Sequence, residues 1–155
     1  MIVESKVVDI NVLAIFLVSD HPAHKYVKDT MMQGLKGFFR PVFFDILPIR
    51  TYWLMTTKWN IDKHESARVT RSFLTKYTQP AYVGMTRETI DRAFRLAQEL
   101  RHDVYDCCYL ALAIQEGASS VITTDSDFQS LCKRQGLGYE NPVPKHVMKD
   151  FKRSP

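Results

Sequence analysis

The chain has 155 residues, of which 45% are hydrophobic and 25% are charged, and these proportions suit one globular domain with a single core. No apolar run approaches the length that crosses a bilayer, and the first residues lack the pattern of a signal peptide, so we expect a cytoplasmic protein without a membrane role. The formal net charge of +4 permits an anionic partner such as a nucleic acid.

Short apolar runs alternate with amphipathic segments along the chain. The sequence predicts strands at 6–9, 42–44, 81–85, 120–124 and 139–143, and helices at 11–18, from Pro22 to about 35, and at 48–59, 62–77, 86–100, 104–115 and 126–134. Strands that alternate with helices favour a short parallel sheet covered on both faces, a three-layer α/β/α arrangement. No linker or repeat interrupts the chain, so residues 1–155 are expected to form one domain with a basic tail from about residue 144.

Two details of the predicted helices can be checked directly. Thr86 is expected to cap the helix that follows it, and Gly117 to end the helix at 104–115. In the helix after Thr86, the clearest amphipathic segment of the chain, the predicted apolar face includes Ile90, Ala93 and Phe94.

Three aspartates occupy positions where a parallel sheet gathers its functional side chains. Asp9 ends the first apolar run, Asp125 follows the fourth, and Asp106 lies at the start of the helix at 104–115. Ligands bind beyond the carboxyl ends of parallel strands, so the three carboxylates are expected to meet at one edge of the sheet. Like charges held together repel unless a cation lies between them. Carboxylates without His or Cys nearby favour Mg²⁺ or Mn²⁺.

Each acid also has a structural explanation. Asp9 could form a turn at the strand end, Asp106 could be a first-turn acid favoured by the helix dipole, and Asp125 could cap a helix that begins at Ser126. Asp103 is the better candidate for a pure cap. The structural roles explain the three acids singly as well as a metal site does, but they do not explain why all three map to the same edge.

The residues around these acids resemble a known family. The segments Val8-Asp9-Ile10-Asn11, Tyr105-Asp106 with Ala111-Leu112-Ala113, and Ile122-Thr123-Thr124-Asp125-Ser126-Asp127-Phe128 are similar to the PIN domain of VapC-type toxins. The resemblance extends over roughly residues 7–143, and its specific part runs from Tyr105 to Phe128.

The resemblance implies a metal-dependent endoribonuclease, usually a homodimer, with RNA as substrate and a protein antitoxin as a possible partner. It implies that Asp9, Asp106 and Asp125 bind the Mg²⁺ or Mn²⁺ ion and act in catalysis. It assigns supporting roles to Asn11 and Thr123 and, in many members, a further acid at the position of Asp127. The remaining alternative is a nuclease-like domain that has lost full activity and binds RNA or a protein.

The sequence departs from the family at one place. The family has a glutamate early in the helix after the second strand, whereas the segment from Phe43 to Arg50 contains no glutamate and has Asp45 as its single acid. Two roles are open for Asp45. It could replace the glutamate as a metal ligand, or it could cap the helix that Pro48 helps to start.

Overall fold

The computed structural model describes residues 2–152, with side chains up to residue 149. Within these residues, one parallel sheet has the strand order β3-β2-β1-β4-β5. The strands are β1 (Ser5–Val8), β2 (Arg40–Phe44), β3 (Ala81–Val83), β4 (Ser120–Ile122) and β5 (Gly138–Glu140). The predicted α/β class with a short parallel sheet is therefore confirmed.

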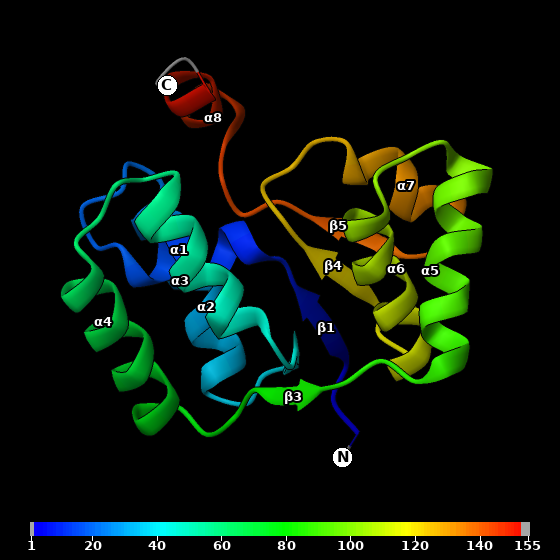
Figure 1. The fold of residues 1–155 in the computed structure, drawn as a ribbon, viewed down its shortest axis with the longest axis horizontal. Helices are drawn as coiled ribbons and strands as arrows, with labels where there is room; N and C mark the ends of the chain where they lie inside the picture. The colour runs from blue at the N-terminus through cyan, green and yellow to red at the C-terminus, as the bar shows by residue number, and fades with distance from the viewer. Residues whose placement is uncertain (1, 153–155) are drawn as a thin grey trace.

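Helices form a layer on each side of the sheet (Figure 1). One layer contains α1 (Ile10–Leu17), α2 (His24–Leu35), α3 (Leu47–Thr57) and α4 (Lys63–Lys76), and the other contains α5 (Arg87–Leu100), α6 (Val104–Glu116) and α7 (Phe128–Arg134). The helix α8 (Lys145–Lys152) follows β5. In the described residues, no helix combines the length and apolar character needed to span a bilayer.

The two layers follow from the alternation of side chains along the strands. Successive strand residues point to opposite faces, so Val8 packs towards α1 and α2 while its neighbour Val7 packs towards α6. Phe43 and Val42 divide in the same way on β2. Burying a side chain of this size contributes roughly 1.5–3 kcal/mol, so both faces hold the helices firmly.

The predicted helix ends agree with the structure at three places. The Thr86 hydroxyl accepts a hydrogen bond from the backbone N–H of Thr89, and Gly117 ends α6 in the left-handed conformation with φ of 62°. Asp103 caps α6, because its carboxylate accepts the backbone N–H of Tyr105 at 2.7 Å. These three local predictions are confirmed.

Other predictions need correction. Ala93 is buried on α5 as expected, but Ile90 and Phe94 are 43% and 59% exposed. The reason is that α5 packs chiefly against α6, which buries a narrow stripe of it. The last strand occupies 138–140 rather than 139–143. The basic tail contains α8, whose Met148 joins the core; Lys145 and Lys149 are exposed, and Arg153 lies outside the described residues.

Candidate active site

The candidate site lies where the direction of the strand order changes. Strands β2 and β3 lie on one side of β1, and β4 and β5 lie on the other. Such a change leaves a crevice at the carboxyl ends of the two central strands. Asp9 follows β1 directly and its backbone N–H donates to the carbonyl of Ile122, the last residue of β4, at 3.0 Å. The sheet thus places Asp9 directly beside the end of β4, a segment distant in the sequence.

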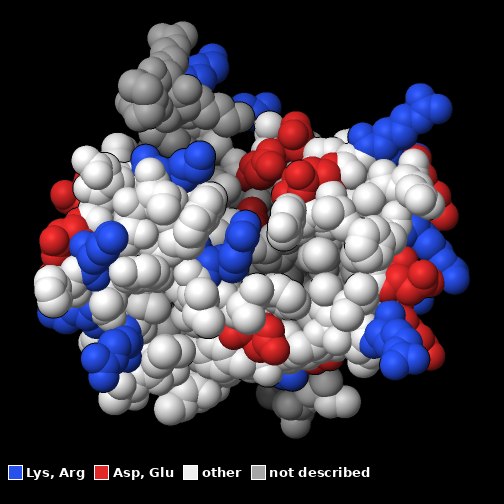
Figure 2. Space-filling model, in the orientation of Figure 1, with Lys and Arg blue, Asp and Glu red and all other residues white. Residues whose placement is uncertain are grey.

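A cavity of about 410 Å³ opens at this edge of the sheet. Asp9, Asp106 and Asp125 all line it, and so does the predicted supporting residue Asn11. Figure 2 shows acidic side chains gathered around a hollow in the upper part of the view, with basic side chains at its border. The expected meeting of three carboxylates from distant segments is therefore present.

Asp9 is the most constrained of the three acids. Its side chain is 4% exposed, and its two oxygens accept hydrogen bonds of 2.7 Å from the backbone N–H of Ile10 and from the hydroxyl of Thr123. Burial raises the pKa of Asp9 from 3.8 to about 6, the two hydrogen bonds act against this rise, and the charges of Asp106 and Asp125 add to it. A nearby cation would relieve this cost.

Thr123 connects two of the acids. Its hydroxyl donates to Asp9 and accepts the backbone N–H of Asp125 at 3.0 Å, so one buried side chain fixes the spacing between β1 and the turn after β4. The predicted supporting position of Thr123 therefore has a clear geometric basis. Asp125 in turn accepts the backbone N–H of Asp127 at 2.9 Å. The helix α7 begins at Phe128, so the prediction of a helix that Asp125 caps at Ser126 is wrong.

Asp106 has a partner that the sequence pattern did not indicate. The Nε2 atom of His102 lies 2.7 Å from a carboxylate oxygen of Asp106. Burial raises the pKa of Asp106, the hydrogen bond with His102 lowers it, and the charge of Asp125 raises it. His102 lies before the start of α6, so the apolar pattern of that helix does not include it. Its separation of four residues from Asp106 was the one signal in the sequence that could have suggested the contact. Asp106 also lies in the first turn of α6, as its structural explanation predicts.

Two further acids, Asp45 and Asp127, were considered as possible members of the site. Asp127 and Asp45 are exposed, and neither lines the cavity. A carboxylate oxygen of Asp45 lies 3.1 Å from the point where a Cβ atom would be on Gly84. The N-cap of α3 is Ile46, without a side-chain hydrogen bond, so the capping role considered for Asp45 is wrong.

The side chain that α3 contributes to the cavity is Arg50. It occupies the first turn of the helix after β2, the region where a family glutamate was expected, and it carries the opposite charge. The sequence pattern gave no reason to select it, because the chemistry under consideration required acids. One wall of the cavity therefore offers carboxylates and the other offers a guanidinium.

The residues fit a divalent ion in their chemistry. Their ligand atoms are carboxylate oxygens, which Mg²⁺ and Mn²⁺ prefer. Burial raises the pKa of Asp9 and of Asp106 and so opposes their ionisation, a cost that a bound cation would reduce. Among the residues that the structure describes, no group of three or more His, Cys, Asp and Glu side chains is already arranged to hold a metal ion. Binding an ion would thus require the carboxylates to draw together.

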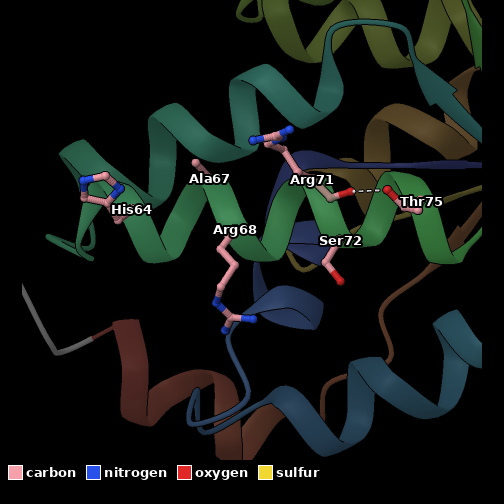
Figure 3. Close-up of a pocket in the computed structure, with 6 residues that line it drawn as sticks. All are labelled: His64, Ala67, Arg68, Arg71, Ser72 and Thr75. Atoms are coloured by element: carbon pink, nitrogen blue, oxygen red, sulfur yellow. Dashed lines mark hydrogen bonds between the residues drawn. The ribbon is translucent and has the colours of Figure 1, made fainter.

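A second hollow, of about 540 Å³, lies along α4, and the residues that line it are His64, Ala67, Arg68, Arg71, Ser72 and Thr75 (Figure 3). All belong to a single helix, and Arg68 and Arg71 leave it in different directions. Arg68 is paired with Glu65. Among the described residues no other element contributes a wall, so this hollow is the exposed face of a basic helix. The chemistry is therefore assigned to the acidic cavity.

Comparisons with known proteins agree with the fold. The chain is similar to the structure of Mycobacterium tuberculosis VapC20, a toxin that cleaves the sarcin–ricin loop, with 14% identity, a TM-score of 0.62, and coverage of 81% of this chain and 94% of that chain. It is also similar to VapBC2 from Rickettsia felis bound to a DNA fragment from its promoter, with 16% identity, a TM-score of 0.65, and coverage of 88% of this chain and 98% of that chain. A third similar structure is a toxin–antitoxin complex from Klebsiella pneumoniae, with 20% identity, a TM-score of 0.63, and coverage of 89% of this chain and 98% of that chain.

Identities this low show a shared fold. Comparison with curated protein sequences gives no match. The family model of the PIN domain, however, matches residues 6–134, which include most of β1, all of β4 and all three cavity acids. This chain therefore belongs to the PIN domain family.

Proposed function

We propose that the protein is a metal-dependent endoribonuclease and the toxin of a toxin–antitoxin pair. The observation that supports this most strongly is the shared cavity of Asp9, Asp106 and Asp125 at the carboxyl end of a PIN-family sheet. A buried carboxylate whose pKa is raised to about 6 beside two further acids is costly unless a cation offsets it. The substrate in this proposal is the phosphodiester backbone of RNA.

The residues divide the work as follows. Asp9, Asp106 and Asp125 would hold Mg²⁺ or Mn²⁺, and Thr123 keeps Asp9 oriented through its 2.7 Å hydrogen bond. His102 fixes the direction of the Asp106 carboxylate in the same way. A bound divalent ion supplies a water of lowered pKa and stabilises the negative charge that develops on phosphate oxygens. In this proposal the phosphodiester would be hydrolysed without a covalent intermediate on the protein.

Two partners belong to the proposal. The Rickettsia and Klebsiella structures similar to this chain are toxin–antitoxin complexes, which supports a protein antitoxin as the binding partner here. We also propose that the protein acts as a homodimer, as the family resemblance suggests, and that it acts in the cytoplasm.

The test compares Asp9→Asn, Asp106→Asn and Asp125→Asn with the wild type on a mixed RNA pool in Mn²⁺ and in EDTA. Each substitution keeps the size of the side chain and removes a charge that offsets the cation, so each is expected to abolish nearly all cleavage. Asp29→Asn is the matched control, because this acid is exposed on α2 outside the cavity, and it is expected to cleave normally. Asp127→Asn and Asp45→Asn test whether these two exposed acids contribute to cleavage. Wild-type rates in both Asp9→Asn and Asp125→Asn would refute the nuclease proposal.

One observation favours a second candidate function, a weakened nuclease that acts by binding RNA. Arg50 introduces a positive charge into the cavity, and the described carboxylates are not arranged for a metal ion. In that case the wild type would bind RNA and leave it intact at every Mn²⁺ concentration tested. The same cleavage assay therefore separates the two candidates.

A further inference from the structure

We propose that Arg50 binds a backbone phosphate of single-stranded RNA in the acidic cavity. The inference rests on the proposed function in one respect, that the ligand is RNA. Among the described residues that line the cavity, Arg50 is the one basic side chain, and the three acids share the space with it. The cavity thus has an anion-binding part as well as a cation-binding part.

Two aromatic rings hold the Arg50 side chain. The central carbon of its guanidinium lies 5.3 Å from the centroid of the Trp53 ring and 5.1 Å from that of Tyr105. Trp53 belongs to α3, as Arg50 does, and Tyr105 belongs to α6, so the contact with Tyr105 joins the two helices at the cavity that Arg50 and Tyr105 both line. An arginine stacked on rings keeps the N–H groups at its edge available, because the contact uses only its face.

The donors of Arg50 are not used by the protein. Although three carboxylates line the same cavity, the Arg50 side chain makes no hydrogen bond or ion pair with any residue in the described part of the chain. A guanidinium with a free edge can donate two parallel hydrogen bonds to a phosphate, a geometry that arginine matches better than lysine. The arrangement is therefore prepared for an external anion.

The acids explain why such a residue is needed. A phosphodiester that approaches Asp9, Asp106 and Asp125 meets like charge, and the attraction of Arg50 opposes this repulsion from the other wall. Tyr105 is 62% exposed, so its ring also offers a surface on which an unpaired base can stack. Single-stranded RNA is thus the anion that fits both features.

The test measures RNA binding in EDTA, where no metal contributes. The probe is a fluorescein-labelled oligouridylate of about ten nucleotides, a length typical of single-strand sites, followed by anisotropy over a range of KCl concentrations. Arg50→Gln is expected to weaken binding about tenfold, since a charged hydrogen bond is lost, and to reduce the slope of log affinity against log salt by roughly 0.7. Arg50→Lys should bind with intermediate affinity because it retains the charge and loses the fork.

The matched control is Arg92→Gln, which removes the same charge from an exposed position on α5 outside the cavity and should bind like the wild type. Thermal melting shows whether each variant is folded. If Arg50→Gln binds RNA as tightly and with the same salt slope as Arg92→Gln, the inference is overturned. The inference is also overturned if Arg50→Gln weakens the binding of a labelled polyglutamate peptide but leaves the binding of the RNA unchanged.

Cleavage in Mn²⁺, measured in parallel, keeps the two proposals apart. A wild type that fails to cleave but loses RNA affinity on Arg50→Gln overturns the nuclease function and leaves the phosphate-binding role of Arg50 standing. A wild type that cleaves with an unchanged KM after Arg50→Gln overturns the role of Arg50 alone.

Discussion

At the scale of single residues, Asp9 shows a conflict between burial and charge. The side chain has almost no contact with solvent, yet hydrogen bonds from Ile10 and Thr123 orient it as a carboxylate. Its pKa of about 6 means that burial outweighs these bonds. A residue whose charged form is this expensive has a purpose other than stability, and a position in the cavity gives it one.

The cost of ionising the buried Asp9 side chain should appear in the pH dependence of the free energy of unfolding. Because the pKa of Asp9 is about 6 in the folded protein and 3.8 ordinarily, the folded state keeps a proton that the unfolded chain releases as pH rises. In metal-free buffer, the wild type should therefore lose stability relative to Asp9→Asn between about pH 4 and 6, by up to roughly 3 kcal/mol, and then remain level. Urea denaturation of both proteins at several pH values measures the difference, and a constant difference from pH 4 to 7 would contradict it.

At the scale of elements, the two helix starts near the cavity differ in their capping. Asp103 accepts backbone N–H groups at the start of α6, whereas Asp45, before α3, caps nothing. The first turn of α3 is instead anchored by packing, since Leu47 is fully buried. An aspartate in front of a predicted helix is therefore not sufficient evidence for a cap.

This difference gives a direct comparison. Asp103→Ala should cost about 1 kcal/mol of stability and Asp103→Asn close to nothing, because asparagine caps as well as aspartate. Asp45→Ala should change stability by less than about 0.5 kcal/mol, as for a surface site without a structural role. Chemical denaturation at neutral pH measures all three, and a loss of about 1 kcal/mol in Asp45→Ala would show that this carboxylate supports α3 after all.

The sequence predicted most of the fold because its signals were local. Apolar strands, Thr86 and Gly117 fix their own elements, and acids that follow parallel strands must share an edge. Features that depend on distant packing were not accessible. The helix α8 is held by Met148 against a core built from earlier helices, and Phe94 remains exposed because no further layer covers α5. Arg50 was missed because its residue type gave no hint that its guanidinium would reach the acidic cavity.

At the scale of the whole molecule, α3 presents an apolar stripe to solvent. Ile46 precedes the helix, Ile49 and Trp53 follow at intervals of a helical turn, and the three are 43%, 69% and 44% exposed. Self-association is an expectation from the family resemblance, and this stripe is the surface that we propose for it. An exposed stripe of this kind is expected at an interface between proteins.

We therefore expect a dimer, measured by light scattering at micromolar concentrations. Ile49→Lys should shift the mass towards the monomer because it places a charge in the stripe, while Phe94→Lys, on the exposed face of α5, should leave the mass unchanged. A monomer mass for the wild type over the whole concentration range would contradict the expectation.

The pairing of β1 with β4 has a consequence for synthesis of the protein. Asp9 leaves the ribosome long before Thr123, whose hydroxyl orients it and which lies 114 positions later, and Asp125 comes later still. Because chains emerge from the amino terminus onwards, no nascent fragment that stops short of β4 contains a complete acidic cavity. For the proposed ribonuclease, this order of assembly delays the appearance of activity until β4 and the turn that carries Asp125 have been synthesised.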